Sequence, residues 1–374
     1  MRSEPRVLIV AGEASGDLHA ASLLKELRQK IPSLQAFGVG GSGLRLQGMD
    51  VVVDCAQVNV IGAWDWIDKV REVFRSYFTL KRTVRERRPD LAILLDLPDF
   101  NLRLARFLKK QKVPVIYYIS PQVWAWRRYR VRIIRDRVSR MLVVFPFEKK
   151  FYQDHGVEVS FVGHPLLDSI RPRLLNRTQS EVASGPRIAV LPGSRKSEIR
   201  FHLPIVREVL RRLKHQYPNA EVRVPIAPTV DAENLSSEFG ERVRCETGNA
   251  LDVLQWADVA LVASGTATLE TALVGTPFCL FYRVSATSAW LFQNIVRYQG
   301  FIGMPNVLAG REIVREFFQQ RATPDRIFEE LKRLIEDEAY RKEVGETLLS
   351  IRSSLGDTGA SRRAATEILA FLKN

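Results

Sequence analysis

The sequence predicts two α/β domains, each a doubly wound, Rossmann-like parallel sheet, facing each other across a cleft and followed by a helical C-terminal tail. The chain has 374 residues, which is more than one hydrophobic core usually serves, so two domains are expected. Short apolar, β-branched runs alternate with helix-length segments, as in a parallel sheet that is covered on both faces. This alternation breaks off near residues 166–186 and then starts again.

The expected strands are the short apolar runs. In the first half they are Arg6–Ala11, Leu91–Leu95, Val115–Ile119 and Met141–Phe145. In the second half they are Arg187–Leu191, Glu221–Val224, Val243–Cys245, Val259–Ala263 and Pro277–Phe281. We expect an N-terminal domain at 1–165, a linker at 166–186, a C-terminal domain at 187–355 and a final helix at 356–374. That helix is expected either to cross back onto the first domain or to exchange with a second copy of the chain in a homodimer.

Composition excludes several classes of protein. A hydrophobic share of 46% rules out a disordered or collagen-like chain, and three scattered cysteines make neither a disulfide framework nor a zinc cluster. The five histidines lack ligand spacing, so no metal and no cofactor is expected. The first ten residues lack the apolar core of a signal peptide, and no apolar stretch is long enough to span a membrane. A cytoplasmic protein, soluble or peripheral to a membrane, is therefore expected.

The net charge of +14 indicates an anionic partner. The basic excess lies mainly in two stretches, Lys69–Arg88 and Arg127–Arg140. Nucleic acid, an acidic membrane surface and a phosphorylated substrate all fit such a charge, and a plain solvated helix face fits it as well.

Two loops of the first domain follow expected strands, at the edge of the sheet where ligands bind. In Gly12–Asp17, the two glycines allow a tight turn, and the amides that open the next helix can face an anion or a sugar hydroxyl. The alternative is a simple turn with Ser15 or Asp17 as N-cap, although Glu13 is not needed for capping. In the loop Asp96–Asn101, Asp96 and Asp99 stand where a general base is needed, and either could instead cap the following helix.

Two loops of the second domain suit a nucleotide diphosphate. In Leu191–Arg195, a glycine turn with a hydroxyl and a guanidinium can donate to phosphoryl oxygens; the three residues are Gly193, Ser194 and Arg195. In Ala263–Glu270, the residues at the helix start are Ser264, Gly265 and Thr266. Glu270 could accept hydrogen bonds from ribose hydroxyls, and the alternative is an ordinary capped helix. Neither loop matches the dinucleotide-binding fingerprint or the P-loop.

The segment Val60–Arg88 is predicted to form an aromatic and basic helix. Trp66, Phe74 and Phe78 recur at helical spacing among lysines and arginines, which is typical of a helix lying in a lipid interface. The alternative is an ordinary core helix packed on the sheet. No RNA- or DNA-binding motif accompanies the aromatic residues, so nucleic acid is not expected as a partner.

Several of these motifs also carry a family resemblance, which runs nearly end to end. They are GEASGD (Gly12–Asp17), PDFN (Pro98–Asn101), SPQVWAWR (Ser120–Arg127), FPFE (Phe145–Glu148), FVGHP (Phe161–Pro165), LPGSR (Leu191–Arg195), ASGTATLE (Ala263–Glu270) and MPNVLAGRE (Met304–Glu312). In these motifs the sequence resembles the lipid-A-disaccharide synthase family, inverting glycosyltransferases of the GT-B class. The resemblance implies a reaction in lipid A biosynthesis without a metal. UDP-2,3-diacylglucosamine donates its sugar to the 6-hydroxyl of 2,3-diacylglucosamine 1-phosphate (lipid X), which gives a β-1,6-linked disaccharide 1-phosphate and UDP.

The resemblance also implies residue roles. Asp99 is the candidate base, with Glu13 as the other carboxylate to test. Arg195 would neutralise the diphosphate, Glu270 would hold the ribose and Asn306 would line the donor site. Ser15, Arg127 and Arg128 would meet the acceptor or lipid headgroups. Such an enzyme is expected on the cytoplasmic face of the bacterial inner membrane, held peripherally on an anionic leaflet.

Other functions remain open at this point. A UDP-N-acetylglucosamine 2-epimerase shares the architecture and the nucleotide loops but needs no apolar acceptor surface. A membrane-bound nucleotide-binding adaptor without catalysis and a nucleic-acid-binding protein are the further alternatives.

Overall fold

The computed structural model describes residues 4–58, 66–125, 127–174, 185–227, 230, 232–239, 243–285 and 300–373. The chain divides into two compact units, Met1–Asp168 with Leu355–Asn374 (unit 1) and Ser169–Ser354 (unit 2). Part of the segment expected as a linker is helical, because α8 covers Leu166–Leu174.

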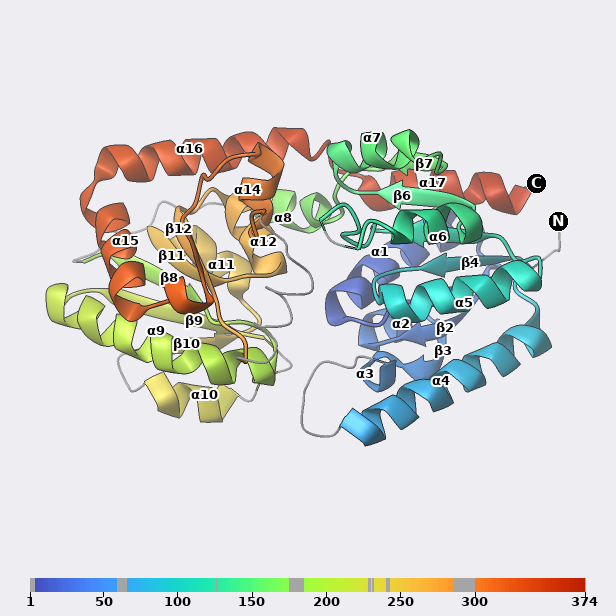
Figure 1. The fold of residues 1–374 in the computed structure, drawn as a ribbon, viewed down its shortest axis with the longest axis horizontal. Helices are drawn as coiled ribbons and strands as arrows, with labels where there is room; N and C mark the ends of the chain where they lie inside the picture. Colours follow the sequence, from blue (N-terminus) through green and yellow to red (C-terminus); the bar gives the residue numbers. More distant parts are fainter. Residues whose placement is uncertain are drawn as a thin grey trace. The chain divides into compact units, whose positions relative to one another are not determined.

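Unit 1 is built on a parallel sheet with the strand order β3-β2-β1-β4-β5-β6-β7 (Figure 1). The strands are β1 (Arg6–Val10), β2 (Gln35–Gly40), β3 (Asp50–Asp54), β4 (Leu91–Leu94), β5 (Val115–Tyr118), β6 (Arg140–Val143) and β7 (Val159–Phe161). The strands β1, β4 and β5 at its centre are almost wholly buried, which explains their continuous apolar sequence.

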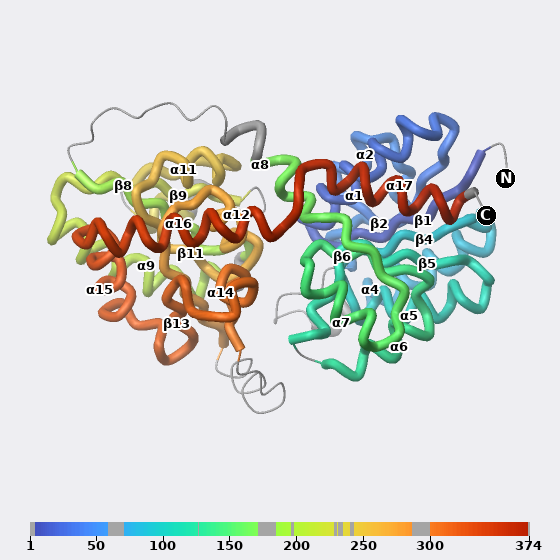
Figure 2. Tube along the Cα trace, turned by 90° about the horizontal axis from the view of Figure 1, so that it is seen from above, coloured from blue at the N-terminus to red at the C-terminus, as the bar shows by residue number. Residues whose placement is uncertain are grey.

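The helices of unit 1 cover both faces of this sheet. They are α1 (Ala14–Lys30), α2 (Ser42–Leu46), α3 (Cys55–Val58), α4 (Trp66–Arg87), α5 (Pro98–Lys110), α6 (Arg130–Arg137), α7 (Pro146–Asp154) and α17 (Ala360–Lys373). Helix α1 contacts α2 and α17, whereas α5 contacts both α4 and α6, as expected where right-handed crossovers place the two groups of helices on opposite faces. The C-terminal helix α17 packs beside α1 of the same chain (Figure 2). Asp168 accepts hydrogen bonds from the amides of Gly359 and Ser361 at the start of α17.

Unit 2 repeats the plan with the parallel order β10-β9-β8-β11-β12-β13. Its strands are β8 (Arg187–Leu191), β9 (Glu221–Ile226), β10 (Val243–Thr247), β11 (Val259–Ala263), β12 (Phe278–Tyr282) and β13 (Glu316–Phe318). Its helices are α9 (Lys196–Gln216), α10 (Ala232–Phe239), α11 (Ala250–Trp256), α12 (Thr266–Val274), α14 (Met304–Ala309), the short 3-10 helix η2 (Gln319–Arg321), α15 (Pro324–Glu336) and α16 (Glu338–Ser354).

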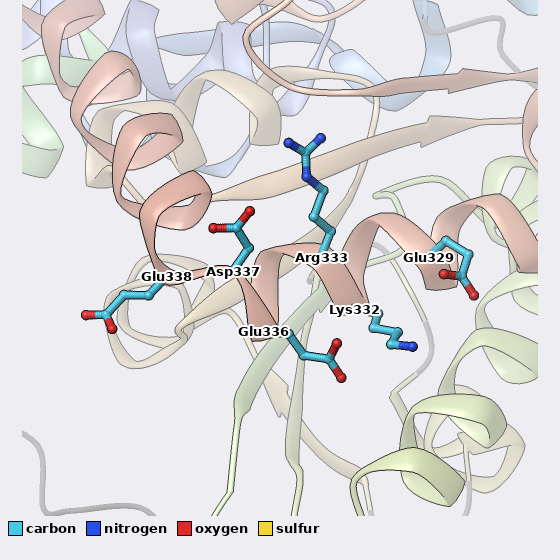
Figure 3. Close-up of a pocket in the computed structure, with 6 residues that line it drawn as sticks. All are labelled: Glu329, Lys332, Arg333, Glu336, Asp337 and Glu338. Atoms are coloured by element: carbon cyan, nitrogen blue, oxygen red, sulfur yellow. The ribbon is translucent and has the colours of Figure 1, made fainter.

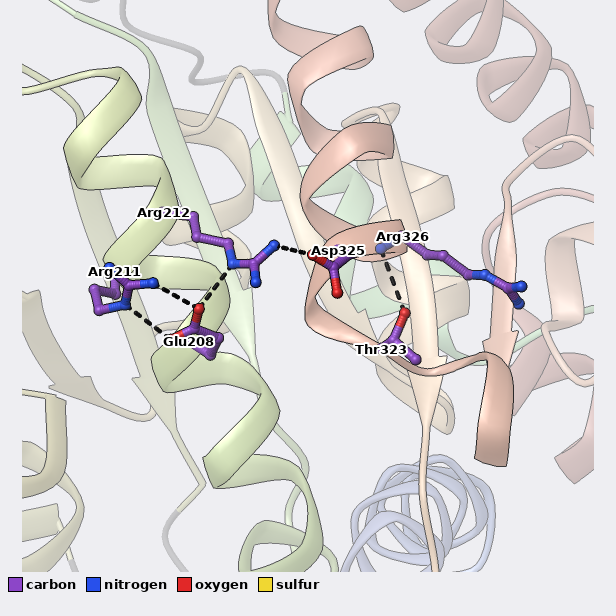
Figure 4. Close-up of polar contacts among 6 residues, drawn as sticks. All are labelled: Glu208, Arg211, Arg212, Thr323, Asp325 and Arg326. Carbon is purple, nitrogen blue, oxygen red and sulfur yellow. Dashed lines mark hydrogen bonds and ion pairs between the residues drawn. The ribbon is translucent and has the colours of Figure 1, made fainter.

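Polar contacts join α9 to α15 (Figure 4). Arg212 of α9 donates to Asp325 in the first turn of α15, and it also donates to Glu208 over 2.8 Å. The hydroxyl of Thr323 caps α15 by accepting from the amide of Arg326. These contacts support the helix whose N-terminus carries Arg195.

The two doubly wound parallel sheets that the sequence predicts are confirmed. In each sheet the strand order reverses beside the first strand, between β1 and β4 in unit 1 and between β8 and β11 in unit 2. Ligands of such sheets bind outside the carboxyl ends of the strands at this reversal. The register pairs Val10 with Leu94 and Leu191 with Val262, so the two loops that begin at each reversal are neighbours.

Candidate active site

The two loops at the reversal in unit 1 are joined by the side chain of Asp96. Its carboxylate accepts hydrogen bonds from the amides of Gly12, at 2.9 Å, and Glu13, at 3.2 Å. A Cβ atom on Gly12 would lie 1.9 Å from Cδ1 of Leu97, and one on Gly16 would lie 1.9 Å from Oδ2 of Asp96. The two glycines, which were expected to allow a tight turn, thus also allow close approach of the neighbouring loop.

Asp96 itself is held in an unusual environment. Burial above all, together with the nearby Glu13 and Asp17 carboxylates, raises the pKa of its carboxyl to about 8 against the opposing effect of the two amide donors. Its φ angle of 48° lies in the left-handed region, as does that of Leu97 at 35°. Left-handed non-glycine residues cost energy and cluster at functional sites. From the sequence, Asp96 was a candidate base or helix cap. Its hydrogen bonds to the loop that begins at Gly12 were not predicted.

Neither of the expected N-caps of this region is present. The N-cap residue of α5 is Leu97 and that of α1 is Glu13, and neither side chain makes a capping hydrogen bond. Asp17 is buried and accepts from the amides of Gly41 and Gly43 at 2.7 Å each, so it caps α2 and not its own helix. Ser15 lies half-buried in the first turn of α1.

Asp99 lies in the first turn of α5 with a side chain that is 68% exposed. Its Oδ2 accepts from Nη1 of Arg127 at 3.2 Å, and its Oδ1 accepts from Nη2 of Arg130. Arg128 points to another partner, because its Nε donates to the carbonyl of Trp124. The structure therefore brings Asp99 and Arg127 together and adds Arg130, whose partner could not be read from the sequence.

A buried carboxyl supports the loop that carries these arginines. Glu148 accepts from Nε1 of Trp124 at 3.1 Å and from the amide of Phe145 at 3.2 Å. Burial raises the pKa of Glu148 to about 7, although these donors and the Ser120 hydroxyl act in the opposite direction. Glu148 was visible in the sequence as the last residue of a family motif, without an indication of its contacts.

In unit 2 the loop after β8 presents Arg195 at the N-terminus of α9. Its Nη1 donates to Oε1 of Glu198 at 2.9 Å, and the same oxygen accepts from the Tyr282 hydroxyl at 3.3 Å. Gly193 has a φ angle of 120°, which a side chain rarely adopts, and Ser194 is exposed. Glu198 and Tyr282 thus orient the predicted diphosphate ligand Arg195, and both were missed from the sequence.

The loop after β11 is open at the N-terminus of α12. Gly265 and Thr266 are exposed, and nothing lies within 4 Å of a Cβ placed on Gly265. The hydroxyl of Ser264 donates to the carbonyl of Ile302 at 3.4 Å. Glu270 makes no hydrogen bond or ion pair with any residue that the structure describes, and burial raises the pKa of its carboxyl. A carboxylate that is desolvated and has no protein partner in this part of the chain is available to a ligand hydroxyl.

Asn306 is placed differently from the expected donor-site contact. It is fully buried, and its amide nitrogen donates to the carbonyl of Val314 and to Glu316, each at 2.8 Å. Its amide oxygen accepts from the amides of Ile313 and Val314. All its hydrogen-bonding capacity is used inside unit 2, so in this structure Asn306 fastens α14 to the segment before β13.

Comparison with known proteins decides the family. The model of the lipid-A-disaccharide synthetase family matches residues 7–367, which include most of unit 1 and all of unit 2. The chain belongs to this family. It is 42% identical to a lipid-A-disaccharide synthase of Myxococcus xanthus (100% of this chain, 99% of that protein) and 41% identical to one of Syntrophus aciditrophicus (98% of each). The family resemblance found in the sequence is thereby confirmed.

Solved structures with low sequence identity share the fold. A UDP-GlcNAc 2-epimerase of Neisseria meningitidis bound to UDP-GlcNAc is 14% identical with a TM-score of 0.66, over 99% of this chain and 100% of that one. A glycotransferase of kitacinnamycin is 18% identical with a TM-score of 0.65, with the same coverage. At these identities the likeness shows the GT-B fold alone, and the predicted fold class is confirmed in that respect.

In this family member, the aromatic and basic helix α4 has two distinct faces. Leu80 and Val84 are buried in the core of unit 1, with Val73 and Tyr77 packed against it. The other face carries exposed aromatic rings and cations: Phe74, Phe78, Arg71, Arg75, Arg82 and Arg85. The side chain of Trp66 lies outside the described residues. The core interpretation therefore holds for one face of the helix, and the exposed aromatic and basic residues lie on the other.

The family member also has a shallow hollow of about 600 Å³ where α15 meets α16. Figure 3 shows its charged side chains pointing in different directions from one helix junction. They are Glu329, Lys332, Arg333, Glu336, Asp337 and Glu338. Because they do not converge on a point, we assign no ligand to this hollow. None of the helices in the described part of the chain is long and apolar enough to cross a membrane.

Proposed function

We propose that this protein transfers 2,3-diacylglucosamine from UDP-2,3-diacylglucosamine to the 6-hydroxyl of 2,3-diacylglucosamine 1-phosphate. The products are the β-1,6-linked lipid A disaccharide 1-phosphate and UDP. The observation that carries the proposal is the family match through residues 7–367, together with relatives near 40% identity that are named lipid-A-disaccharide synthase. The protein is a glycosyltransferase of lipid A biosynthesis.

The proposal assigns proton removal to Asp99 in unit 1. In an inverting transfer, a base takes the proton of the acceptor hydroxyl while the oxygen attacks the anomeric carbon and UDP departs. Asp99 is an exposed carboxylate in the first turn of α5, which begins at the sheet reversal, as this role requires. Glu13 lies half-buried on the neighbouring loop and is the other carboxylate to test.

The proposal assigns the donor to unit 2. Arg195 at the N-terminus of α9 and the amides at the N-terminus of α12 would stabilise the negative charge that develops on the leaving diphosphate. Gly193, Ser194, Ser264, Gly265 and Thr266 would add polar contacts. Glu270 would accept hydrogen bonds from the ribose. Asn306 would support this region from inside the domain.

The proposal places the enzyme on the cytoplasmic face of the inner membrane. Both substrates carry acyl chains, so the enzyme would reach them at a lipid surface. The exposed Phe74 and Phe78, with arginines around them, are suited to insertion among anionic headgroups.

The test is incubation with both diacylated substrates, with and without a chelator, followed by mass measurement of the lipid product. We expect the disaccharide 1-phosphate at equal rates in both conditions, because the assigned diphosphate ligands are arginine and amide groups. Asp99→Asn should reduce turnover roughly 10²- to 10⁴-fold and should still bind UDP. A UDP-sugar inverted at C2 would instead identify an epimerase, and unchanged turnover of Asp99→Asn would exclude this residue as the base.

A further inference from the structure

The two arginines that hold Asp99 differ in their exposure. The side chain of Arg130 is 6% exposed and contacts Oδ1, whereas that of Arg127 is 40% exposed and contacts Oδ2 at 3.2 Å. One carboxylate oxygen is thus held from the interior of unit 1. The other is held by a guanidinium that solvent, and therefore a substrate, can reach.

Arg127 is also held in a backbone conformation that L-residues avoid. Its φ angle is 58°, in the short segment between Trp124 and α6. Such a conformation persists where the surrounding structure imposes it, and it is common at ligand-binding sites. A guanidinium presents several N–H donors in a plane and matches a phosphate with two parallel hydrogen bonds. Arg127 is therefore placed and equipped for a phosphate close to Asp99.

The chemistry of the proposed acceptor requires a cation at this place. Its 6-hydroxyl is attached through C6 to C5, and its phosphate is attached to C1. C5 and C1 flank the ring oxygen, so the hydroxyl and the phosphate lie at the same edge of the sugar. A base within hydrogen-bond distance of the hydroxyl consequently has the phosphate as a near neighbour, and two anions so close together need a cation between them.

We propose that Arg127 binds the 1-phosphate of the acceptor and in doing so releases Oδ2 of Asp99; this inference rests on the proposed function. Arg130 keeps Oδ1 and the orientation of the carboxylate. The 6-hydroxyl then loses its proton to Oδ2, its oxygen forms the bond to the anomeric carbon of the donor, and the bond from that carbon to UDP breaks with its electron pair leaving on UDP. Without a phosphate on the acceptor, Arg127 stays on the base. The phosphate thus acts on turnover as well as on binding.

The test compares two acceptors, 2,3-diacylglucosamine 1-phosphate and 2,3-diacylglucosamine, with the wild-type enzyme, Arg127→Gln and Arg132→Gln. Arg132 is an exposed arginine of the same helix as Arg130 and serves as the control for loss of one charge. We expect the wild type and Arg132→Gln to prefer the phosphorylated acceptor in kcat/KM. Arg127→Gln should reduce this preference roughly 10- to 100-fold through a higher KM and lower kcat for the phosphorylated acceptor. With the acceptor that lacks phosphate, it should be as fast as the wild type or faster.

Each other outcome has a distinct meaning. If the wild type forms no disaccharide from either acceptor, the proposed function fails. If the wild type forms it and Arg127→Gln keeps the full preference, the phosphate binds elsewhere and the inference is wrong. If Arg127→Gln slows both acceptors equally while UDP binding is retained, Arg127 only positions Asp99, which also overturns the inference.

Discussion

The carboxylate of Asp96 occupies the space that a side chain on Gly16 would need. A Cβ atom on Gly16 would lie 1.9 Å from Oδ2 of Asp96, and that carboxylate already accepts hydrogen bonds from the amides of Gly12 and Glu13. Asp96 has a short side chain with few rotamers, so it cannot move away without losing these two contacts. The position of Asp96 in the second loop therefore requires a glycine at position 16 in the first loop.

We predict that Gly16→Ala lowers the free energy of unfolding by about 1–3 kcal/mol, the usual cost of overpacking a closely packed site. Turnover should fall as well, since the displaced Asp96 lies in the loop that leads into α5, three residues before Asp99. Denaturant unfolding and steady-state kinetics measure the two effects. Ser15→Ala in the same helical turn is the matched control, and equal stability of the two variants would contradict the steric argument.

A second prediction concerns pH and the buried carboxyl of Glu148. Its pKa is raised to about 7, from an ordinary value near 4.5, so the folded chain binds this proton more tightly than the unfolded chain does. The stabilising contribution is complete below about pH 4.5 and is lost as the pH rises through 7. Glu148→Gln removes this titration. Its stability relative to wild type should therefore rise between pH 5 and pH 8, by on the order of 3 kcal/mol.

Glu208 provides a control, because its pKa is lowered where that of Glu148 is raised. It is partly exposed on α9, and hydrogen bonds from Arg211 and Arg212 lower its pKa to about 2 (Figure 4). Its contribution is present above about pH 4.5 and is lost as the pH falls through 2. Glu208→Gln should accordingly leave the slope of stability between pH 5 and pH 8 unchanged. A Glu148→Gln variant with the wild-type slope in that range would show that the carboxyl titrates normally.

Structural features that depend on local sequence patterns could be predicted here, whereas contacts between residues far apart in the sequence could not. The buried central strands, such as β4 and β11, are continuous apolar runs and were predicted, whereas β2 and β3 and the three-residue β7 and β13 were not. The loops at the sheet reversals were predicted because topology alone places them there. The hydrogen-bonded partners of the candidate residues were not, because Arg130 and Asp99, for example, are 31 residues apart.

The helix α4 shows a limit of periodicity. Phe74 and Phe78 lie on one face and Tyr77, Leu80 and Val84 on another, but the two sets are offset by about one residue, or roughly 100° around the helix. In the sequence they merge into a single apolar stripe. Only burial separates the residues that hold the helix on unit 1 from those that are exposed.

The third prediction concerns the buried and exposed faces of α4. Phe74→Ser with Phe78→Ser should reduce binding to vesicles that contain anionic lipid, and it should leave the free energy of unfolding nearly unchanged, because both rings are more than half exposed. Leu80→Ala should leave vesicle binding by the folded protein nearly unchanged. It should lower the free energy of unfolding by about 2–5 kcal/mol, since Leu80 is fully buried. Vesicle co-sedimentation and denaturant unfolding measure the pair. Unchanged vesicle binding of the double serine variant would leave α4 with a core role alone.

The final prediction separates binding from stability at Glu270. Because burial raises the pKa of this carboxyl and no described residue pairs with it, the charged form is stable in the folded chain only at a cost. The cost is absent at low pH and grows as the pH rises above the ordinary carboxyl pKa. Glu270→Gln should therefore be more stable than the wild type at neutral pH. The same variant should bind UDP roughly tenfold more weakly, because a neutral amide oxygen accepts ribose hydroxyls less strongly than a carboxylate.

Two comparisons complete this test. Arg195→Gln should weaken UDP binding and also cost stability, since it leaves the buried Glu198 without its guanidinium partner. Glu329→Gln, an exposed change on α15, should alter neither quantity. Calorimetric titration with UDP and denaturant unfolding give both readouts on the same samples. Glu270 is a ribose ligand only if its variant gains stability while losing affinity, because a purely structural carboxylate would change the two quantities in the same direction.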